Sequence, residues 1–276
     1  MGIRKFIIRT FGICEFFRDV NSFTKQPAWG GESSLSEVTS VQLEFRDISR
    51  IINNSTYEDL TFATSKHIHN IGCKHYDGLC GMFVNPKTGQ FRGKLESCYF
   101  SGYQLRDDYN KSMNAMERHL VRQSEPNKLT FVGEILPGGS YSPKMVKLYL
   151  LFERFVVRVF SWCSIPFAPL DAHCLLRPEA IEAWFYLYRA TGDKIYQEWG
   201  WKAFKALEKH AKVEYGYSSV VNVKRIPVSY RDMMESFFLS ETLKYLYLLL
   251  ADDQSEIPLD RFVFNTEGHP LPIYDH

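Results

Sequence analysis

The chain contains 276 residues, of which 45% are apolar and 24% are charged, and this composition is ordinary for a globular protein. Its length supports a sizeable core, which excludes a disordered chain and a disulfide-stapled miniprotein. Because 33 basic residues are nearly balanced by 32 acidic ones, the net charge of +1 excludes a strongly basic nucleic-acid-binding surface and a polybasic membrane-binding patch. Aromatic residues make up 15% of the chain. Such residues can stack on sugar rings, but they more often fill hydrophobic cores.

The six cysteines form no C-x-x-C pair, so the sequence indicates neither a zinc site nor a thioredoxin-like site, and it leaves any disulfide pairing open. Acceptor triplets for N-glycosylation begin at Asn53, Asn54 and Asn110. They favour a secretory location, although such triplets also arise by chance. Residues 1–17 lack the uninterrupted apolar core of a signal peptide. Charged residues interrupt the apolar stretch 148–170, so we expect a soluble chain without a membrane span.

The first half of the chain predicts helices separated by glycine-rich turns. Residues 34–52 open with the spacing of a capping box and repeat apolar residues at three- and four-residue steps, which predicts a helix. Five glycines punctuate residues 71–93 and indicate a loop or a short hairpin. A second helix is predicted over residues 107–124. A turn-rich breaker follows at residues 137–143.

The last third of the chain carries the clearest helical signals. Pro178 suits the first position of a helix that stops at Gly192, and a second helix is predicted over residues 194–210. Residues 215–223 alternate as a strand does. Residues 233–250 are apolar almost all round, so we expect a long buried helix there. Helix pairs joined by short turns predict a layered, all-α architecture.

Glu179 is the first candidate for chemistry. It follows Arg177 and lies at a helix N-terminus, and both features favour the ionised carboxylate, as a base that activates water requires. In the alternative interpretation, Glu179 and Glu182 only complement the helix dipole, because carboxylates are common in first turns. The residues alone leave both interpretations open.

Two other acidic positions indicate a pocket or a metal. Glu241 lies in the apolar run 237–247, where a buried carboxylate requires a partner, a metal or a pocket. The alternative is a simple pair with Lys244, three residues further along the helix. Thr266 and Glu267 supply a hydroxyl, a carbonyl and a carboxylate in a tight turn, and these are hard oxygen ligands suited to calcium.

Three runs of sequence resemble the signatures of class I α-1,2-mannosidases, glycoside hydrolase family 47. They are residues 176–179 (Leu-Arg-Pro-Glu), residues 234–246 (Met-Glu-Ser-Phe-Phe-Leu-Ser-Glu-Thr-Leu-Lys-Tyr-Leu) and residues 264–272 (Phe-Asn-Thr-Glu-Gly-His-Pro-Leu-Pro). Upstream, residues 33–45 and 124–134 are similar to the endoplasmic-reticulum branch of that family. All these runs stand in the order that the family has.

This resemblance gives an expected domain organisation. Residues 20–276 are predicted to form a partial family 47 catalytic domain. Residues 1–19 form an N-terminal segment without a counterpart, and residues 146–170 form an unmatched insert or replacement. The chain is expected to lack the N-terminal half of the family's enzyme, and residues 146–170 stand where the family has its disulfide.

The resemblance also implies a fold and an activity. The fold is an (α/α)7 barrel, here an incomplete all-α barrel with a few short strands or hairpins. The activity is that of a glycoside hydrolase that removes terminal α-1,2-linked mannose from high-mannose N-glycans, with inversion and with one calcium ion, Ca²⁺. An inverting hydrolase uses one carboxyl group to protonate the leaving oxygen and another to activate water.

The resemblance implies roles for nine residues. Glu179 matches the general base and Arg177 matches a sugar-binding arginine beside it. Thr266 matches the calcium ligand that offers both its hydroxyl and its main-chain carbonyl, with Glu267 in the outer coordination shell. The other matched positions are substrate-binding or pocket residues: the aromatic residue Phe237 against the sugar ring, Glu182 and Glu241 near the metal and its waters, and the further pocket acids Glu37 and Glu134.

Several family features are absent from this sequence. The carboxylate that protonates the leaving group lies upstream of the matched region, and the Asp-bearing motif expected after Gly93 does not occur. Lys147 stands where the family has a pocket histidine, and Gly268 where it has an alanine. The alternative to an active mannosidase is therefore a catalytically inactive mannose-binding or structural relative, or a non-functional fragment of the enzyme.

The family also implies partners and a location. The expected partner is the high-mannose N-glycan of glycoproteins, with no nucleic acid, and we expect a monomer. Family members face the lumen of the endoplasmic reticulum or Golgi from an N-terminal membrane anchor, which we expect to be missing from this chain. Apolar helix faces at 34–52 and 233–250, without the neighbours that cover them in the family, predict poor solubility of the chain expressed alone.

Overall fold

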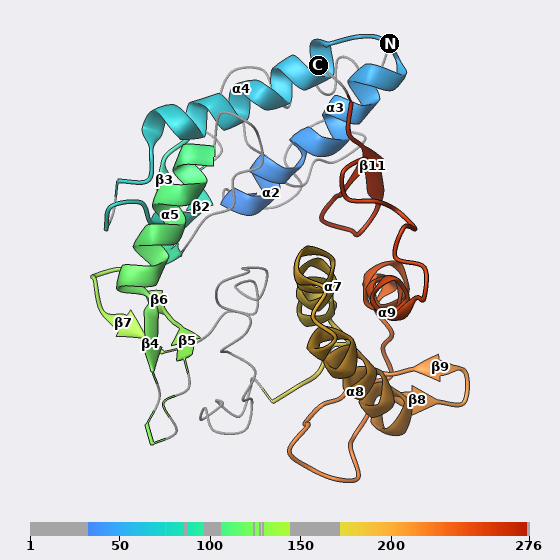
Figure 1. The fold of residues 1–276 in the computed structure, drawn as a ribbon. Coiled ribbons are helices and arrows are strands. Elements are labelled where there is room, and N and C mark those ends of the chain that lie inside the picture. The colour runs from blue at the N-terminus through green and yellow to red at the C-terminus, as the bar shows by residue number, and fades with distance from the viewer. Residues whose placement is uncertain are drawn as a thin grey trace. The chain divides into compact units, whose positions relative to one another are not determined.

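The computed structural model describes residues 33–74, 76–85, 88–96, 106–123, 125–126, 128, 130–143 and 172–274. The chain divides into two compact units. Unit 1 comprises Met1–Arg122 with Phe131–Val146, and unit 2 comprises Gln123–Thr130 with Lys147–His276. Figure 1 shows the helices and strands of both units.

Unit 1 combines helices with a small antiparallel sheet. The helices that the structure describes in it are α2 (Leu35–Ser40), α3 (Gln42–Ile51), α4 (Thr56–Ile71) and α5 (Arg106–His119). The sheet has the order β1-β2-β3-β6-β7, with β1 (Ser33–Ser34), β2 (Cys80–Val84), β3 (Phe91–Glu96), β6 (Glu134–Ile135) and β7 (Tyr141–Ser142). Neighbouring strands are antiparallel throughout. A separate two-stranded sheet joins β4 (Val121–Gln123) to β5 (Thr130–Val132).

The core of unit 1 lies where α2 and α4 meet β2. Leu35, Ile68 and Val84 are fully buried there. A disulfide joins Cys73, just after α4, to Cys80 at the start of β2. Because these two residues stand at the edges of the same core, the bridge ties the helix end to the first long strand.

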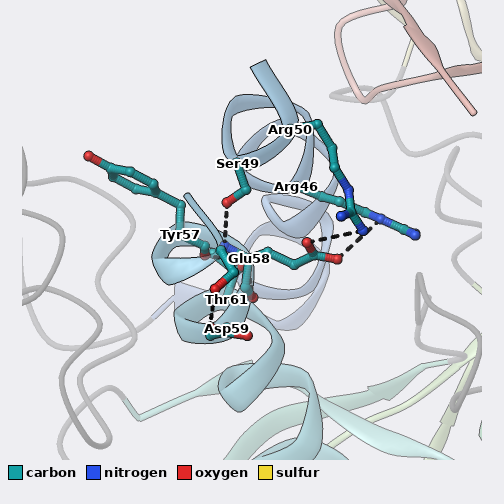
Figure 2. Close-up of polar contacts among 8 residues, drawn as sticks. Arg46, Ser49, Arg50, Tyr57, Glu58, Asp59 and Thr61 are labelled. Atoms are coloured by element: carbon teal, nitrogen blue, oxygen red, sulfur yellow. Dashed lines mark hydrogen bonds and ion pairs between the residues drawn. The ribbon is translucent and has the colours of Figure 1, made fainter. Parts of the chain in front are cut away.

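The α3–α4 pair is held by polar contacts around Glu58 (Figure 2). The backbone N–H of Glu58 donates to Ser49 Oγ at 2.9 Å. The Glu58 carboxylate lies 3.3 Å from Arg46 Nε and 3.5 Å from Arg50 Nη2. Residues from both helices therefore fix the turn between Ile51 and Thr56.

The described part of unit 2 is built on three helical segments. They are α7 (Glu179–Thr191), α8 (Ile195–His210) and the continuous segment η4–α9, in which η4 (Phe238–Leu243) is a π-helix and α9 covers Lys244–Leu250. These three pack against one another (Figure 1). Two short hairpins complete the unit: β8 (Lys212–Val213) with β9 (Gly216–Tyr217), and β10 (Phe262–Phe264) with β11 (Pro270–Pro272).

Aromatic side chains fill the core of unit 2. Phe185 contacts Tyr245 and Phe264 with ring centroids 5.5 and 5.8 Å apart, and Tyr186 lies against the same group. Phe185 and Tyr245 are fully buried. The high aromatic content thus serves core packing in this unit.

The helical predictions are confirmed closely for α7 and α8. Pro178 precedes the first residue of α7, and Gly192 ends it in the left-handed conformation with φ +70°. This is the usual C-terminal arrangement, because glycine adopts positive φ without a Cβ penalty. The glycine-rich residues 71–93 contain β2 and the start of β3, which form a hairpin, as one of the two alternatives predicted.

Other predicted boundaries were wrong. The helix predicted at 34–52 is divided between α2 and α3, and the one predicted at 107–124 ends at His119, because Val121–Gln123 pairs with β5 instead. The strand predicted at 215–223 is reduced to β9 and an isolated bridge at Val220.

The predicted helix 233–250 also differs from the observed one. Residues 233–235 are not helical, and the segment passes through the π-helix before α9. Leu239 and Tyr247 are 56% and 59% exposed, because packing against α7 and α8 uses only part of the helix surface.

Some predictions concern residues outside the described ranges, among them the N-terminal segment 1–19, Lys147 and the apolar stretch 148–170. Among the helices that the structure does describe, none is both long enough and apolar enough to cross a bilayer.

Candidate active site

Four carboxylate side chains of unit 2 share one electrostatic environment. Glu179 and Glu182 lie in the first turn of α7, Glu241 lies in η4, and Glu267 lies in the turn between β10 and β11. The charges of Glu179 and Glu241 both raise the pKa of Glu182, and those of Glu267 and Glu179 raise the pKa of Glu241. Tertiary packing therefore brings together acids from three separate parts of the sequence.

Arg177 lies at the edge of this group and contacts Glu179 and Phe237. Its Nη1 atom is 3.6 Å from Glu179 Oε1, and its guanidinium carbon lies 5.6 Å from the centroid of the Phe237 ring. The Arg177 side chain is 42% exposed and that of Glu179 is 17% exposed. A cation, a carboxylate and an aromatic face are thus presented together at an accessible position, which suits a polar, ring-shaped ligand.

The backbone before α7 is fixed to the π-helix. Thr242 Oγ1 donates to the carbonyl oxygen of Leu176 at 2.7 Å, and both residues are buried. Leu176 has a positive φ of 60°, a conformation that costs free energy for a branched side chain and marks a constrained position. This contact fixes the positions of Arg177 and Glu179 relative to Glu241.

Glu182 is half-buried in the first turn of α7. Burial is the main cause that raises its pKa from 4.5 to about 7, followed by the charge of Glu241. The hydroxyl of Tyr245 donates to Glu182 Oε1 at 3.3 Å and opposes that rise. Burial likewise raises the pKa of the Tyr245 hydroxyl, so this tyrosine remains a proton donor to the carboxylate at all ordinary pH values.

Glu241 lies in the widened turn of the π-helix and is 8% exposed. Burial raises its pKa from 4.5 to about 7, with the charge of Glu267 as the next cause; Lys244 and Arg177 oppose the rise. The simple pair with Lys244 is not the main contact of that lysine, since Lys244 Nζ donates to the carbonyl of Gly268 at 2.6 Å. π-turns are often found at functional sites, because they turn a side chain away from the regular helical ladder.

The β10–β11 turn carries Thr266 and Glu267 to this group. Asn265 Oδ1 accepts hydrogen bonds from the N–H groups of Glu267 and His269, at 3.0 and 2.8 Å. Gly268 has φ +67°, and a Cβ atom there would lie 3.0 Å from Glu241 Cγ. The turn therefore sits directly against the π-helix that carries Glu241.

Several oxygen donors in this region suit a hard cation. Thr266 offers a hydroxyl and a carbonyl, and both it and Glu267 are exposed. Burial and then the charge of Glu267 raise the pKa of the neighbouring Glu241. Within the described residues, no cluster of three or more His, Cys, Asp or Glu side chains is arranged to hold a metal ion. The donor set fits calcium only as a site completed by water or by ligand hydroxyls, which calcium tolerates.

The two other predicted pocket acids, Glu134 and Glu37, belong to unit 1. Glu134 is 1% exposed, and Lys94 Nζ donates to its two carboxylate oxygens at 2.8 and 2.9 Å. Glu37 lies in α2, and its side chain is outside the described part of the structure.

Known proteins resemble this chain in sequence. The model of the family described as "Glycosyl hydrolase family 47" matches residues 16–157 and 151–273. The chain belongs to glycosyl hydrolase family 47. Its sequence is 36% identical to the endoplasmic reticulum mannosyl-oligosaccharide 1,2-alpha-mannosidase of Mus musculus, over 94% of this chain and 49% of that protein. A mannosyl-oligosaccharide 1,2-alpha-mannosidase of Arabidopsis thaliana is 35% identical over 91% of this chain and 55% of its own length.

The structure agrees with membership of family 47. An alpha-1,2-mannosidase from Trichoderma reesei superposes with a TM-score of 0.78 at 22% identity, over 99% of this chain and 73% of that one. At this identity the likeness concerns the fold. The chain spans about half the length of the mouse and Arabidopsis relatives.

Three residues that contact the candidate site or the backbone beside it were not singled out from the sequence as functional. Tyr245, Thr242 and Lys244 lie in the run that carries the resemblance, and each contacts a site residue or the backbone next to one. Tyr245 follows Glu241 by four residues, so helical spacing could have placed it near the acids. Its contact with Glu182, 63 residues away in the sequence, has no local signal.

Proposed function

We propose that this family 47 chain carries a calcium-dependent site that hydrolyses terminal α-1,2-linked mannose of high-mannose N-glycans with inversion. The main support is the group of acids in unit 2, in which Glu179 lies beside Arg177 while Glu182 and Glu241 have their pKa values raised to about 7. The proposed framework is a partial form of the family's (α/α)7 barrel.

The proposed reaction needs a base and an acid on opposite faces of the sugar. Glu179 is proposed to take a proton from the attacking water, while Arg177 and Phe237 hold the sugar ring at the same edge of the site. The leaving oxygen must receive a proton from a second carboxyl group. Glu182 and Glu241 keep a proton up to near neutral pH, so either can supply it.

Thr266, with Glu267 in the outer coordination shell, is proposed to hold the calcium ion. Bound calcium would hold waters and sugar hydroxyls together, because it accepts many oxygen ligands with irregular geometry. The protein's own contribution is to hold the turn that carries Thr266 next to η4, through the hydrogen bonds to Asn265 and the close approach of Gly268 to Glu241.

The proposed location is the lumen of the secretory pathway. The relatives named above include an endoplasmic reticulum enzyme. The Cys73–Cys80 disulfide supports the same location, because disulfides persist in oxidising compartments.

A catalytically inactive, mannose-binding relative is the second candidate. The family's Asp-bearing motif does not occur after Gly93 in this sequence, and Lys94 pairs with Glu134, one of the acids matched to the pocket. Such a chain would retain calcium and mannose contacts without turnover.

The experiment is mannose release from a Man9 N-glycan by the purified chain, with and without a calcium chelator. Chelator-sensitive release that is lost in Glu179→Gln and kept in Glu198→Gln, an exposed residue of α8, supports the hydrolase. Inversion is checked by proton NMR, in which the first-formed mannose must be the β-anomer. Absence of turnover with a calcium-induced rise in melting temperature supports the inactive relative. Absence of both effects overturns both candidates.

A further inference from the structure

The sequence contains three N-glycan acceptor triplets, and the structure distinguishes between them. We propose that Asn53 is the N-glycosylation site of this chain, and that Asn54 and Asn110 are not used. This inference rests on the secretory location contained in the proposed function. It concerns unit 1, whereas the carboxylates that carry the proposed chemistry belong to unit 2.

Asn53 occupies the turn between α3 and α4, and its side chain is exposed. Its φ of 50° is a left-handed conformation that asparagine adopts more readily than most residues. Ile51 and Ile52, immediately before it, are 71% and 49% exposed, so this whole side of the turn faces solvent. A bulky, hydrated oligosaccharide on Asn53 Nδ2 therefore meets no packed side chain of its own turn.

Contacts from both α3 and α4 hold the turn that contains Asn53. Its own N–H donates to the carbonyl of Arg50, and the N–H of Asn54 donates to the carbonyl of Ser49 at 2.9 Å. Across the turn, Glu58 contacts Ser49 and Arg50 (Figure 2). The glycan would thus extend from a defined point of the surface while the helices beneath stay packed.

The hydroxyl of the third residue must be available together with the asparagine. For Asn53 this residue is Ser55, which is exposed. Its Oγ donates to Asp59 Oδ2 at 3.0 Å in an exposed pair, a contact that water readily replaces.

The side chain of Asn54 is engaged in hydrogen bonds to the start of α4, although its triplet overlaps that of Asn53. Its Oδ1 accepts hydrogen bonds from the N–H and the Oγ1 of Thr56, at 3.1 and 2.7 Å. The carboxamide is thereby held half-buried against the first turn of α4, and the hydroxyl that its triplet requires is engaged in the same contact. Asn54 therefore caps the helix.

The third triplet lies inside a helix. Asn110 is exposed within α5, but Ser112, the third residue of its triplet, is 1% exposed. The asparagine and its hydroxyl partner consequently lie on opposite sides of the helix surface, one in solvent and one in the core.

The transfer needs a lipid-linked pyrophosphate oligosaccharide as donor and the transferase of the secretory pathway. A bond forms between Asn53 Nδ2 and the anomeric carbon of the oligosaccharide, and the bond from that carbon to the pyrophosphate oxygen breaks. The carboxamide loses one proton, and the polyprenyl pyrophosphate leaves with the bonding electron pair.

The test is expression of the full chain in a eukaryotic cell line behind a cleavable secretion leader. Occupancy is read by the mobility shift on peptide N-glycosidase treatment and by the Asn-to-Asp conversion that the enzyme leaves at the occupied residue. The overlapping triplets provide a matched pair of variants. Ser55→Ala removes only the Asn53 triplet, and Thr56→Ala removes only the Asn54 triplet.

We expect one glycan on the wild-type chain, loss of the mobility shift in Ser55→Ala and in Asn53→Gln, and its retention in Thr56→Ala and in Asn110→Gln. Retention in Ser55→Ala, loss in Thr56→Ala, or a wild-type chain that enters the lumen without any glycan would overturn the assignment. Because occupancy does not depend on mannosidase activity, a chain glycosylated at Asn53 that releases no mannose would contradict only the proposed hydrolase.

Discussion

Thr242 donates its hydroxyl to the carbonyl oxygen of Leu176 across 66 residues of sequence, at a distance of 2.7 Å. This buried bond connects the π-helix that carries Glu241 with Leu176. Arg177 follows Leu176 directly, and Glu179 lies two positions after Arg177. The relative position of the acids from α7 and η4 therefore depends on a side chain that is not itself acidic.

Thr242→Val is expected to lower the free energy of unfolding by about 1–2 kcal/mol, because it leaves a buried carbonyl without its donor. It should also diminish the rise in melting temperature on calcium addition that the proposed calcium site predicts, since Arg177 and Glu179 lose their anchor to the π-helix. Both effects are measured by thermal and urea unfolding, with and without calcium.

Thr61→Val is the matched control for Thr242→Val. Thr61 is also 1% exposed and also donates to backbone carbonyls, but it lies in α4 of unit 1. It should lower stability and leave the calcium effect unchanged. An equal loss of the calcium effect in both variants would contradict the role given to Thr242.

The raised pKa of Glu182 predicts a specific pH dependence. The folded chain holds a proton on Glu182 up to about pH 7, whereas the unfolded chain loses it near 4.5, so stability falls as the pH rises through this window. Glu182→Gln removes the free-energy cost of ionising this carboxyl group in the folded chain. Its stability relative to the wild type should therefore improve by up to about 3 kcal/mol between pH 5 and pH 7.5, measured by urea unfolding in the presence of chelator.

The exposed Glu198 supplies the comparison for Glu182. Glu198→Gln tests whether the pH dependence is specific to Glu182, because Glu198 is an exposed residue of α8. A pH-independent difference for Glu182→Gln would show that Glu182 is not buried as described.

Gly200 allows α8 to approach α9, which continues the helix of Glu241. A Cβ atom at Gly200 would lie 2.6 Å from Leu249 Cδ2. Gly200→Ala is expected to cost about 1–3 kcal/mol through overpacking, which exceeds the gain of about 1 kcal/mol in helix propensity. In a Leu249→Ala background the same substitution should become stabilising. A double-mutant cycle by urea unfolding measures this, and additive effects would contradict the close approach.

The Cys73–Cys80 disulfide closes a short loop beside the core of unit 1. Replacing both cysteines by serine should lower the stability of this unit by about 2 kcal/mol, because the unfolded chain regains loop entropy. Cys174→Ser, which removes a free thiol of unit 2, should leave unit 1 unchanged. Peptide mapping without reductant checks the pairing, and an unfolding midpoint insensitive to reductant would refute the contribution.

The local sequence determined the helices whose ends carry their own signals. Pro178 and Gly192 bound α7, and the periodic apolar residues between them predict its buried face, because these effects act within one or two turns of the chain. The runs that resemble family 47 also identified Glu179, Glu241 and Thr266 as candidate site residues, and the family itself is confirmed.

The tertiary structure decided the features that depend on partners distant in the sequence. The strand Val121–Gln123 exists because β5 pairs with it, although its sequence continues a helical pattern. Glu134 was predicted from the resemblance as a pocket acid, and only folding shows its ion pair with Lys94, 40 residues away. The pKa values of Glu182 and Glu241 follow the same principle: ionisation of a carboxylate is penalised by loss of water and by neighbouring charges, and both are set by the packing of distant segments.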